Sequence, residues 1–182
     1  MKIKIFLVVS LIAINFGVLA QTTYSLTRPY GGGNISLVEI DMTIGSETII
    51  HTYSPNELYD YNPEATTFDY QNNRFITVGY FVGGLESIIA IDITNGNIDF
   101  TYQSSTQEIF TVEQNNSKTY SLTRPYGGGN ISLVEIDMTI GSETIIHTYS
   151  PNELYDYNPK ATTFDYQNNR FITVGYFVGG LE

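Results

Sequence analysis

Cysteine and tryptophan are absent from this 182-residue chain, and basic residues are scarce: 8 lysines and arginines stand against 19 acidic residues, giving a net charge of −11. Without cysteine the chain forms no disulfide framework, no thiolate metal site and no cysteine-linked lipid anchor. A strongly negative surface repels phosphate backbones, so we expect no nucleic acid partner. The same surface is compatible with a protein or a neutral glycan as partner, and we expect no cofactor.

Long apolar runs are missing beyond the first twenty residues, so we expect no transmembrane segment, which takes roughly 20 apolar residues. Within those first residues, Lys2 and Lys4 precede an apolar run over 5–16, and small or β-branched residues lead to Ala20. This three-part layout predicts a cleavable secretory signal peptide, cut after Ala20. We therefore expect residues 21–182 to be secreted or periplasmic.

A helical period is missing as well: no window of the mature chain repeats apolar residues every 3.6 positions. What is abundant is tyrosine (15 residues), phenylalanine (10) and glycine (16), with many isoleucines, threonines and asparagines. β-Branched and aromatic side chains favour strands, while glycine and asparagine favour turns. The composition predicts an all-β fold.

A long internal repeat organises the chain. Residues 23–86 recur at 119–182, and the only difference is Glu64 in the first copy against Lys160 in the second. Because selection for a fold does not preserve every surface residue, such identity indicates a recent duplication or an artefact of gene assembly. The second copy stops at Glu182, where the first copy continues beyond Glu86.

A shorter period lies inside the long one, with Asp41, Asp92 and Asp137 marking the same point of successive units. Each unit reads as four short strands, a to d, in roughly 40–50 residues, which is typical of a β-propeller blade. The c-to-d turns carry glycine where a hairpin needs positive φ. The strands expected in the two full units are 65–71, 74–80, 87–93 and 97–102, then 109–114, 118–124, 132–138 and 143–150.

The strand order along the chain is bcd, abcd, abcd, ab. Propellers typically close with 4–8 blades, so about three blades do not complete a ring. We therefore expect an open or incomplete ring, a fragment of a longer protein, or an assembly that closes through other copies. Open blade edges expose unpaired backbone groups and favour self-association.

The segments "SLVEIDMTIGSETI" and "SIIAIDITNGNIDF" carry a resemblance to a known family. Their strand–Asp–turn–Gly–strand core resembles the PQQ-like and YVTN-like blades of exported bacterial β-propeller repeat proteins. The resemblance covers most of the chain after the signal peptide. It implies a scaffold whose relatives often bind proteins or glycans and are in some cases enzymes.

Glycine-rich "RPYGGGN" invites a phosphate-binding interpretation. A phosphate loop needs a following Lys-Ser/Thr and a helix N-terminus, whereas a strand follows here. We interpret this stretch as a b-to-c connection.

The aspartates of the turns and the two histidines are the other candidates for metal ligands or catalytic residues. Asp41, Asp92 and Asp137 begin turns, where an aspartate accepts backbone N–H groups, and a calcium loop needs more oxygen ligands than these turns offer. His51 and His147 lie in d strands without a nucleophile pattern nearby. We predict neither a metal site nor a catalytic site from these residues.

The two long loops of each unit are the basis for predicting a binding function. In a propeller the b-to-c and d-to-a loops emerge on one face, and here both are long and rich in tyrosine, whereas the other two turns are tight. Binding residues concentrate on loops held by a rigid scaffold, and tyrosine offers large contact area at low entropic cost. The alternative is that Pro55, Leu58 and Pro63 merely fold the loop onto the blade. The candidate binding residues are Arg28, Tyr30, Asn34, Glu57, Tyr59, Asp60 and Tyr61, with their copies Arg124, Tyr126, Asn130, Glu153, Tyr155, Asp156 and Tyr157.

Three functional hypotheses follow. The first is a secreted, non-enzymatic binding module with a glycan or protein ligand on the long-loop face. The second is a fragment of a polysaccharide-acting hydrolase or lyase that uses paired carboxylates such as Glu57 and Asp60. Identical acids in both copies favour multivalent binding over a single active site. The third is a truncated or misassembled gene product without a function of its own.

Overall fold

The structure, a computed structural model, describes residues 22–82, 84–116, 118–154 and 156–176. The predicted signal peptide lies outside these residues. The described residues form strands and turns without a helix. The strands are β1 (Thr22–Thr27), β2 (Ile35–Asp41), β3 (Ser46–Tyr53), β4 (Asp60–Asp69), β5 (Arg74–Tyr80), β6 (Glu86–Asp92), β7 (Ile98–Gln103), β8 (Gln107–Ile109), β9 (Glu113–Asn115), β10 (Lys118–Pro125), β11 (Ser132–Asp137), β12 (Ser142–Thr148), β13 (Asp156–Asp165) and β14 (Arg170–Tyr176).

These strands form four antiparallel sheets, which we call blades 1 to 4. Blade 1 is β1-β2-β3, blade 2 is β4-β5-β6-β7, blade 3 is β12-β11-β10 with β8 and β9 both on the free side of β10, and blade 4 is β13-β14. Consecutive strands pair as neighbours, as in propeller blades. The predicted all-β class and the open series of antiparallel blades are confirmed, and blade 2 has the predicted four strands.

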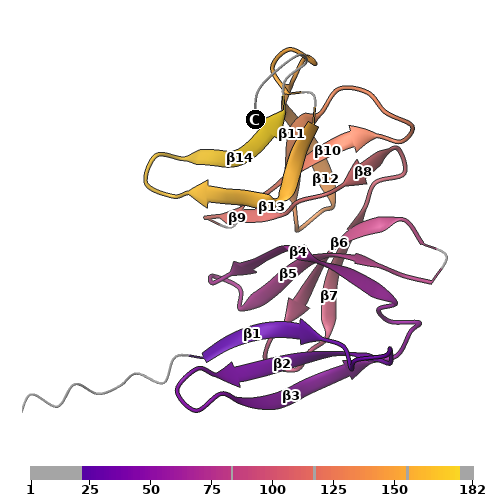
Figure 1. The fold of residues 1–182 in the computed structure, drawn as a ribbon, viewed down its shortest axis with the longest axis vertical. Helices are drawn as coiled ribbons and strands as arrows, with labels where there is room; N and C mark the ends of the chain where they lie inside the picture. Colours follow the sequence, from indigo (N-terminus) through magenta and orange to yellow (C-terminus); the bar gives the residue numbers. More distant parts are fainter. Residues whose placement is uncertain (1–21, 83, 117, 155, 177–182) are drawn as a thin grey trace, which may run out of the picture.

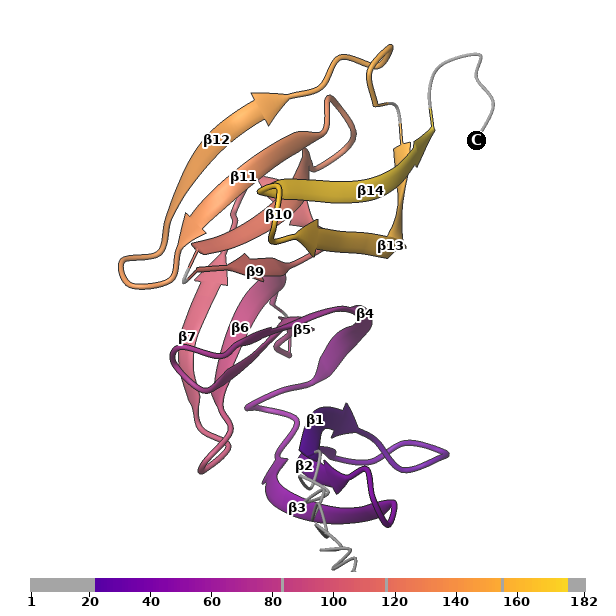
Figure 2. The same cartoon turned by 90° about the vertical axis from the view of Figure 1, so that its left-hand side faces the viewer.

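Blades 1, 2 and 3 follow one another along the long axis of the molecule, and blade 4 (β13–β14) lies beside blade 3 at the end opposite β1–β3 (Figure 1). The inner strands β4, β9 and β13 contact one another, so blades 2, 3 and 4 gather around a shared centre. Figure 2 shows the same arc from the side, with blade 1 at one end and blade 4 against blade 3 at the other. Among the described residues, the blades do not close into a ring.

Side chains alternate between the two faces of each blade and fill the spaces between blades. In β5, Phe75 packs toward blade 1 with Leu26 and Leu37, whereas Ile76 and Val78 point the other way, toward blade 3. Each inner blade therefore contributes to two cores.

Three apolar clusters result, one at each junction between blades. The cluster between blades 2 and 3 has the most buried members, and these side chains are almost fully buried. The buried members are Ala65, Ile76, Val78, Ile88, Ala90, Tyr102, Ile109, Val112, Val134 and Ile136.

Two strand boundaries differ from the sequence-based expectation. The a strand expected over 109–114 is interrupted, because the Thr111 hydroxyl accepts the Leu122 N–H (3.0 Å) and the Thr111 carbonyl accepts the Ser121 hydroxyl (2.6 Å). These side-chain bonds replace ladder bonds, and the strand splits into β8 and β9. The a strand expected from residue 65 begins earlier, at Asp60, with a register shift between Asn62 and Thr66.

The tight turns have the predicted chemistry. Gly45, Gly96 and Gly141 adopt φ of +69°, +77° and +70° in the c-to-d turns, a region that favours glycine. In the a-to-b turns Asn73 and Asn169 take the same role at φ of +54° and +53°, which asparagine tolerates better than most residues.

Candidate binding site on the long-loop face

The two long loops of the first repeat meet at one contact. Arg28, just after β1, places its Nη1 3.3 Å from the Asp60 carboxylate, and its other guanidinium nitrogen donates to the Tyr59 carbonyl. Arg28 thus joins the b-to-c loop of blade 1 to the connection that leads into blade 2. Both charged side chains remain partly exposed.

The connection between blades 1 and 2 is held by its own turn. The N–H groups of Glu57 and Leu58 both donate to the Ser54 carbonyl, each at 3.0 Å, and the Glu57 carboxylate accepts the Ser54 N–H at 2.8 Å. These bonds lower the pKa of the Glu57 carboxyl, with the nearby His51 adding to the effect. Leu58 is fully buried in the core between blades 1 and 2. Glu57 and Leu58 therefore shape the loop.

The loop and the end of β5 enclose a recess. It has a volume of about 490 Å³, and a smaller recess of about 210 Å³ adjoins it through the shared residues Tyr59 and Asp60. The larger one is lined by Tyr59, Asp60, Tyr61, Asn62, Pro63, Tyr80, Phe81 and Gly84. The smaller one is lined by Arg28, Gly33, Asn34, Pro55, Leu58, Tyr59 and Asp60.

Aromatic rings of two kinds line the larger recess. Tyr61 and Tyr80 are partly buried and fixed: the Tyr61 hydroxyl donates to the Leu26 carbonyl at 2.6 Å, and the Tyr80 hydroxyl donates to Glu86 at 2.8 Å. Burial raises the pKa of both hydroxyls, so both stay protonated donors at neutral pH. Tyr59 is 56% exposed, and its N–H donates to the Tyr80 carbonyl at 2.8 Å, so its ring is presented from a fixed backbone.

Sequence reasoning missed Tyr80 and Phe81. Tyr80 ends the b strand expected over 74–80 and Phe81 follows it, and the end of a b strand lies on the same face as the b-to-c loop. The remaining residues predicted in the first repeat, Tyr30 and Asn34, are exposed on the glycine loop, and Asn34 lines the smaller recess.

The copy in the second repeat has different surroundings. Arg124 pairs with Glu108 of β8 at 3.2 Å and lies 5.3 Å from the Phe110 ring centre. Tyr126 and Asn130 are exposed, and Glu153 caps the Ser150 turn as Glu57 caps its own. Asp156 begins β13 with an exposed side chain. Tyr155 and the side chain of Tyr157 lie outside what the structure describes.

The histidines are packing residues beside their own loops. His51 and His147 lie 4.0 and 3.8 Å from Glu57 and Glu153, and each ring contacts the tyrosine two residues on. Across the described residues, no three histidines or carboxylates come together in a way that would hold a metal ion.

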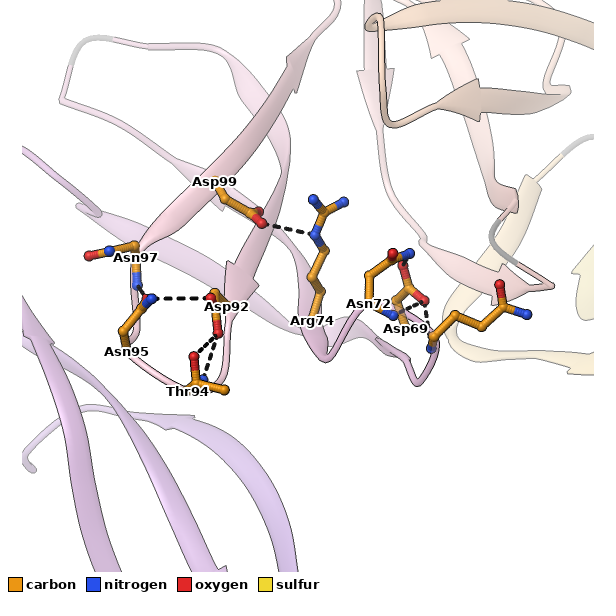
Figure 3. A network of polar contacts seen from close by, with 9 residues as sticks. Asp69, Asn72, Arg74, Asp92, Thr94, Asn95, Asn97 and Asp99 are labelled. Carbon is orange, nitrogen blue, oxygen red and sulfur yellow. Dashed lines mark hydrogen bonds and ion pairs between the residues drawn. The ribbon is translucent and has the colours of Figure 1, made fainter.

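The opposite face of the molecule is built from aspartate turns (Figure 3). Asp92 accepts the N–H and hydroxyl of Thr94 at 2.7 and 2.6 Å and the Asn95 amide at 3.1 Å. These hydrogen bonds lower the pKa of the Asp92 carboxyl. Asp41 and Asp137 bond their own turns in the same way, so the structural interpretation of these aspartates is confirmed.

A polar cavity of about 620 Å³ lies on this turn face between blades 2 and 3. Its charges are largely matched: Arg74 pairs with Asp99 at 2.9 Å, and Lys118 pairs with Glu135 at 2.9 Å. Asp69, also at its rim, accepts the N–H groups of its own turn. The aromatic recess of the long-loop face is therefore the better candidate for a ligand site.

Comparison with known proteins gives a fold likeness only. No family model matches the chain, and no curated protein matches its sequence. Among solved structures, it is similar to Sqt1 of Saccharomyces cerevisiae, with 15% sequence identity and a TM-score of 0.45 over 84% of this chain. The match spans 42% of the Sqt1 chain, so this chain covers less than half of that protein. Helices able to cross a membrane are absent from the described residues.

Proposed function

We propose that this protein is an exported, non-enzymatic binding module whose ligand occupies the aromatic recess formed by Tyr59, the start of β4 and the end of β5. The observation that carries the proposal is the recess itself, lined by the exposed Tyr59, the fixed Tyr61 and Tyr80, and Asp60, whose partner Arg28 lines the adjoining smaller recess. Its volume lies within the roughly 300–1,000 Å³ typical of ligand pockets. The resemblance to exported bacterial propeller repeats agrees with this function and stays part of the proposal.

The chemistry of the recess suits a neutral glycan or an extended peptide segment of a protein. Flat aromatic faces pack against the apolar face of a sugar or against an apolar side chain. Arg28 and Asp60 offer donor and acceptor groups beside the rings, within reach of hydroxyls or amides. The acidic surface disfavours anionic ligands.

The hydrolase or lyase alternative gains no support from the geometry. A glycosidase needs one carboxyl that stays protonated to act as general acid. The Glu57 carboxyl has a lowered pKa and is bonded to its own turn, while Asp60 pairs with Arg28. We therefore assign both residues to shaping and binding.

A binding experiment tests the site. The mature chain is applied to a glycan array and, separately, to a library of extended peptides, and the strongest hit is measured by calorimetry. Tyr59→Ala and Arg28→Ala are each expected to weaken that binding about tenfold or more, as for residues central to an interface. Tyr70→Ala is the matched control, because Tyr70 is 81% exposed on the opposite face. Binding that survives both recess substitutions would exclude this recess as the site.

Export is tested separately by expressing the full chain in a bacterial host with a periplasm. The proposal expects the protein in the periplasmic or culture fraction, with Gln21 as its N-terminal residue. Retention in the cytoplasm with an intact N-terminus would contradict it.

A further inference from the structure

The two ends of the arc expose residues that are buried inside it. At the blade 4 end, Ile172 and Val174 of β14 are 47% and 48% exposed. Their counterparts in the first repeat, Ile76 and Val78 of β5, are 1% and 0% exposed, because blade 3 covers them. The sequence of the two strands is identical, so β14 presents the same apolar side chains that blade 3 covers on β5.

The blade 1 end shows the complementary pattern at two positions, whereas Val38 is already buried within the chain, like its counterpart Val134. Met42, just after β2, is 58% exposed, and Ile40 is only partly buried. Their counterparts in the second repeat are Met138, which packs against the core between blades 2 and 3, and Ile136, which is 1% exposed.

Inside the arc these two faces belong to one junction. Ile76 and Val78 of blade 2 share a single apolar cluster with Ile136 and Met138 of blade 3. A second copy of the chain carries the same residues at its opposite end, since both faces are repeated in the sequence. We propose that copies of this chain associate head to tail, with the Ile172–Val174 face of one copy packed on the Ile40–Met42 face of the next.

The proposed contact joins two different surfaces, so it is heterologous. Such contacts close into rings when the rotation between copies allows it and otherwise extend into filaments. The described part of blade 1 has no segment equivalent to β8–β9, which supplies Ile109 of β8 and Val112 just before β9 to the internal junction. The contact between copies is therefore less extensive than the internal one, and we expect association to depend on concentration.

Sedimentation velocity across the micromolar range tests the proposal on the full chain after signal removal. The expected result is a mass that rises with concentration to at least twice that of one chain. Ile172→Lys with Val174→Lys blocks one end, and Met42→Lys blocks the other. Each variant alone is expected to sediment as a monomer, whereas an equimolar mixture is expected to form dimers that grow no further, because each variant keeps one intact end.

Ile145→Lys is the matched control, since Ile145 of β12 is 55% exposed away from both ends, and it is expected to associate like the parent. Circular dichroism of each variant establishes that it is folded. A monomeric parent at every concentration would overturn the proposal, whatever other molecule covers the faces. So would end-blocked variants that associate as the parent does, or a mixture that fails to dimerise.

Cross-linking gives a second readout that does not depend on lysine substitution. The chain has no cysteine, so Met42→Cys and Val174→Cys each introduce a single thiol. A short thiol-reactive cross-linker is expected to join the two variants to each other far more efficiently than to themselves. Equal yields of mixed and self-linked products would contradict a head-to-tail contact.

Discussion

The two repeats of this protein allow corresponding strands of nearly identical sequence to be compared in two different surroundings. Their residues are the same at every position but one, yet the first repeat presents a half-exposed β1 and a buried β5, whereas the second presents a buried β10 and a half-exposed β14. The reason is position in the arc: blade 3 covers the outward face of β5, and β8 and β9 cover the free edge of β10.

The difference teaches that burial in a blade is decided by its neighbours. The same arginine pairs with Asp60 across the loops in the first repeat and with Glu108 of its own blade in the second. The second partner exists because β8 lies beside β10, and blade 1 has no such strand among the described residues. Identical sequences therefore make different contacts and expose different surfaces in the two repeats.

The largest expected effect is the difference between Ile76→Ala and Ile172→Ala in the free energy of unfolding that each substitution costs. Ile76 is buried at the junction of two complete blades, and removing such a side chain leaves a cavity that costs about 2–4 kcal/mol. Ile172 is 47% exposed, so its substitution is expected to cost less than about 1 kcal/mol. Urea unfolding, at a concentration where the parent is monomeric, measures both. Equal costs would contradict the account of burial by neighbours.

A smaller effect is expected at the c-to-d turns. Gly96, Gly45 and Gly141 share a positive φ, but a Cβ on Gly96 would lie 2.1 Å from the His51 Cβ, whereas one on Gly45 meets nothing within 4 Å. The left-handed conformation alone costs alanine about 1–2 kcal/mol. We expect Gly45→Ala to cost that amount and Gly96→Ala clearly more, with thermal unfolding as the measure. A Gly96→Ala variant as stable as Gly45→Ala would show that blades 1 and 2 move apart easily.

Much of the fold is visible in the sequence because blade chemistry is local. The strand expected over 74–80 forms as β5, the glycines of the c-to-d turns adopt positive φ, and the aspartates bond their own turns. Each of these features depends on residues only a few positions apart, which a single sequence displays. The order of the strands follows from the same pattern, apart from the split into β8 and β9.

What the sequence does not show depends on distant neighbours. The interruption between β8 and β9 arises from bonds between Thr111 and the backbone and side chain of β10. Tyr80 and Phe81 join the candidate site because the end of β5 lies beside Tyr59 and the start of β4, more than fifteen residues earlier in the chain. The different partners of Arg28 and Arg124 are likewise invisible in two identical strings of residues.

A third prediction concerns Glu113 of β9, a strand that blade 1 lacks among the described residues. Burial raises the pKa of the Glu113 carboxyl, and the Thr162 hydroxyl only partly offsets this. Because the folded-state pKa is raised, the protonated form favours folding below the usual pKa, and that contribution is lost as pH rises through the folded-state pKa. Glu113→Gln is therefore expected to raise the melting temperature by about 2 °C at pH 7 and to change it little near pH 4. A pH-independent effect would contradict this explanation.

The smallest expected effect is at the one position where the repeats differ. Glu64 lies exposed in the shifted segment of β4, and its N–H donates to the Asn62 side chain at 3.0 Å, a bond that any residue except proline maintains. Glu64→Lys makes the first repeat identical to the second and is expected to change the free energy of unfolding by less than about 0.5 kcal/mol, as for most surface substitutions. Urea unfolding of the parent and the variant at equal ionic strength measures the difference. A change well above that range would mean that this position contributes to stability in one repeat only, and that the copies have begun to adapt to their different places in the arc.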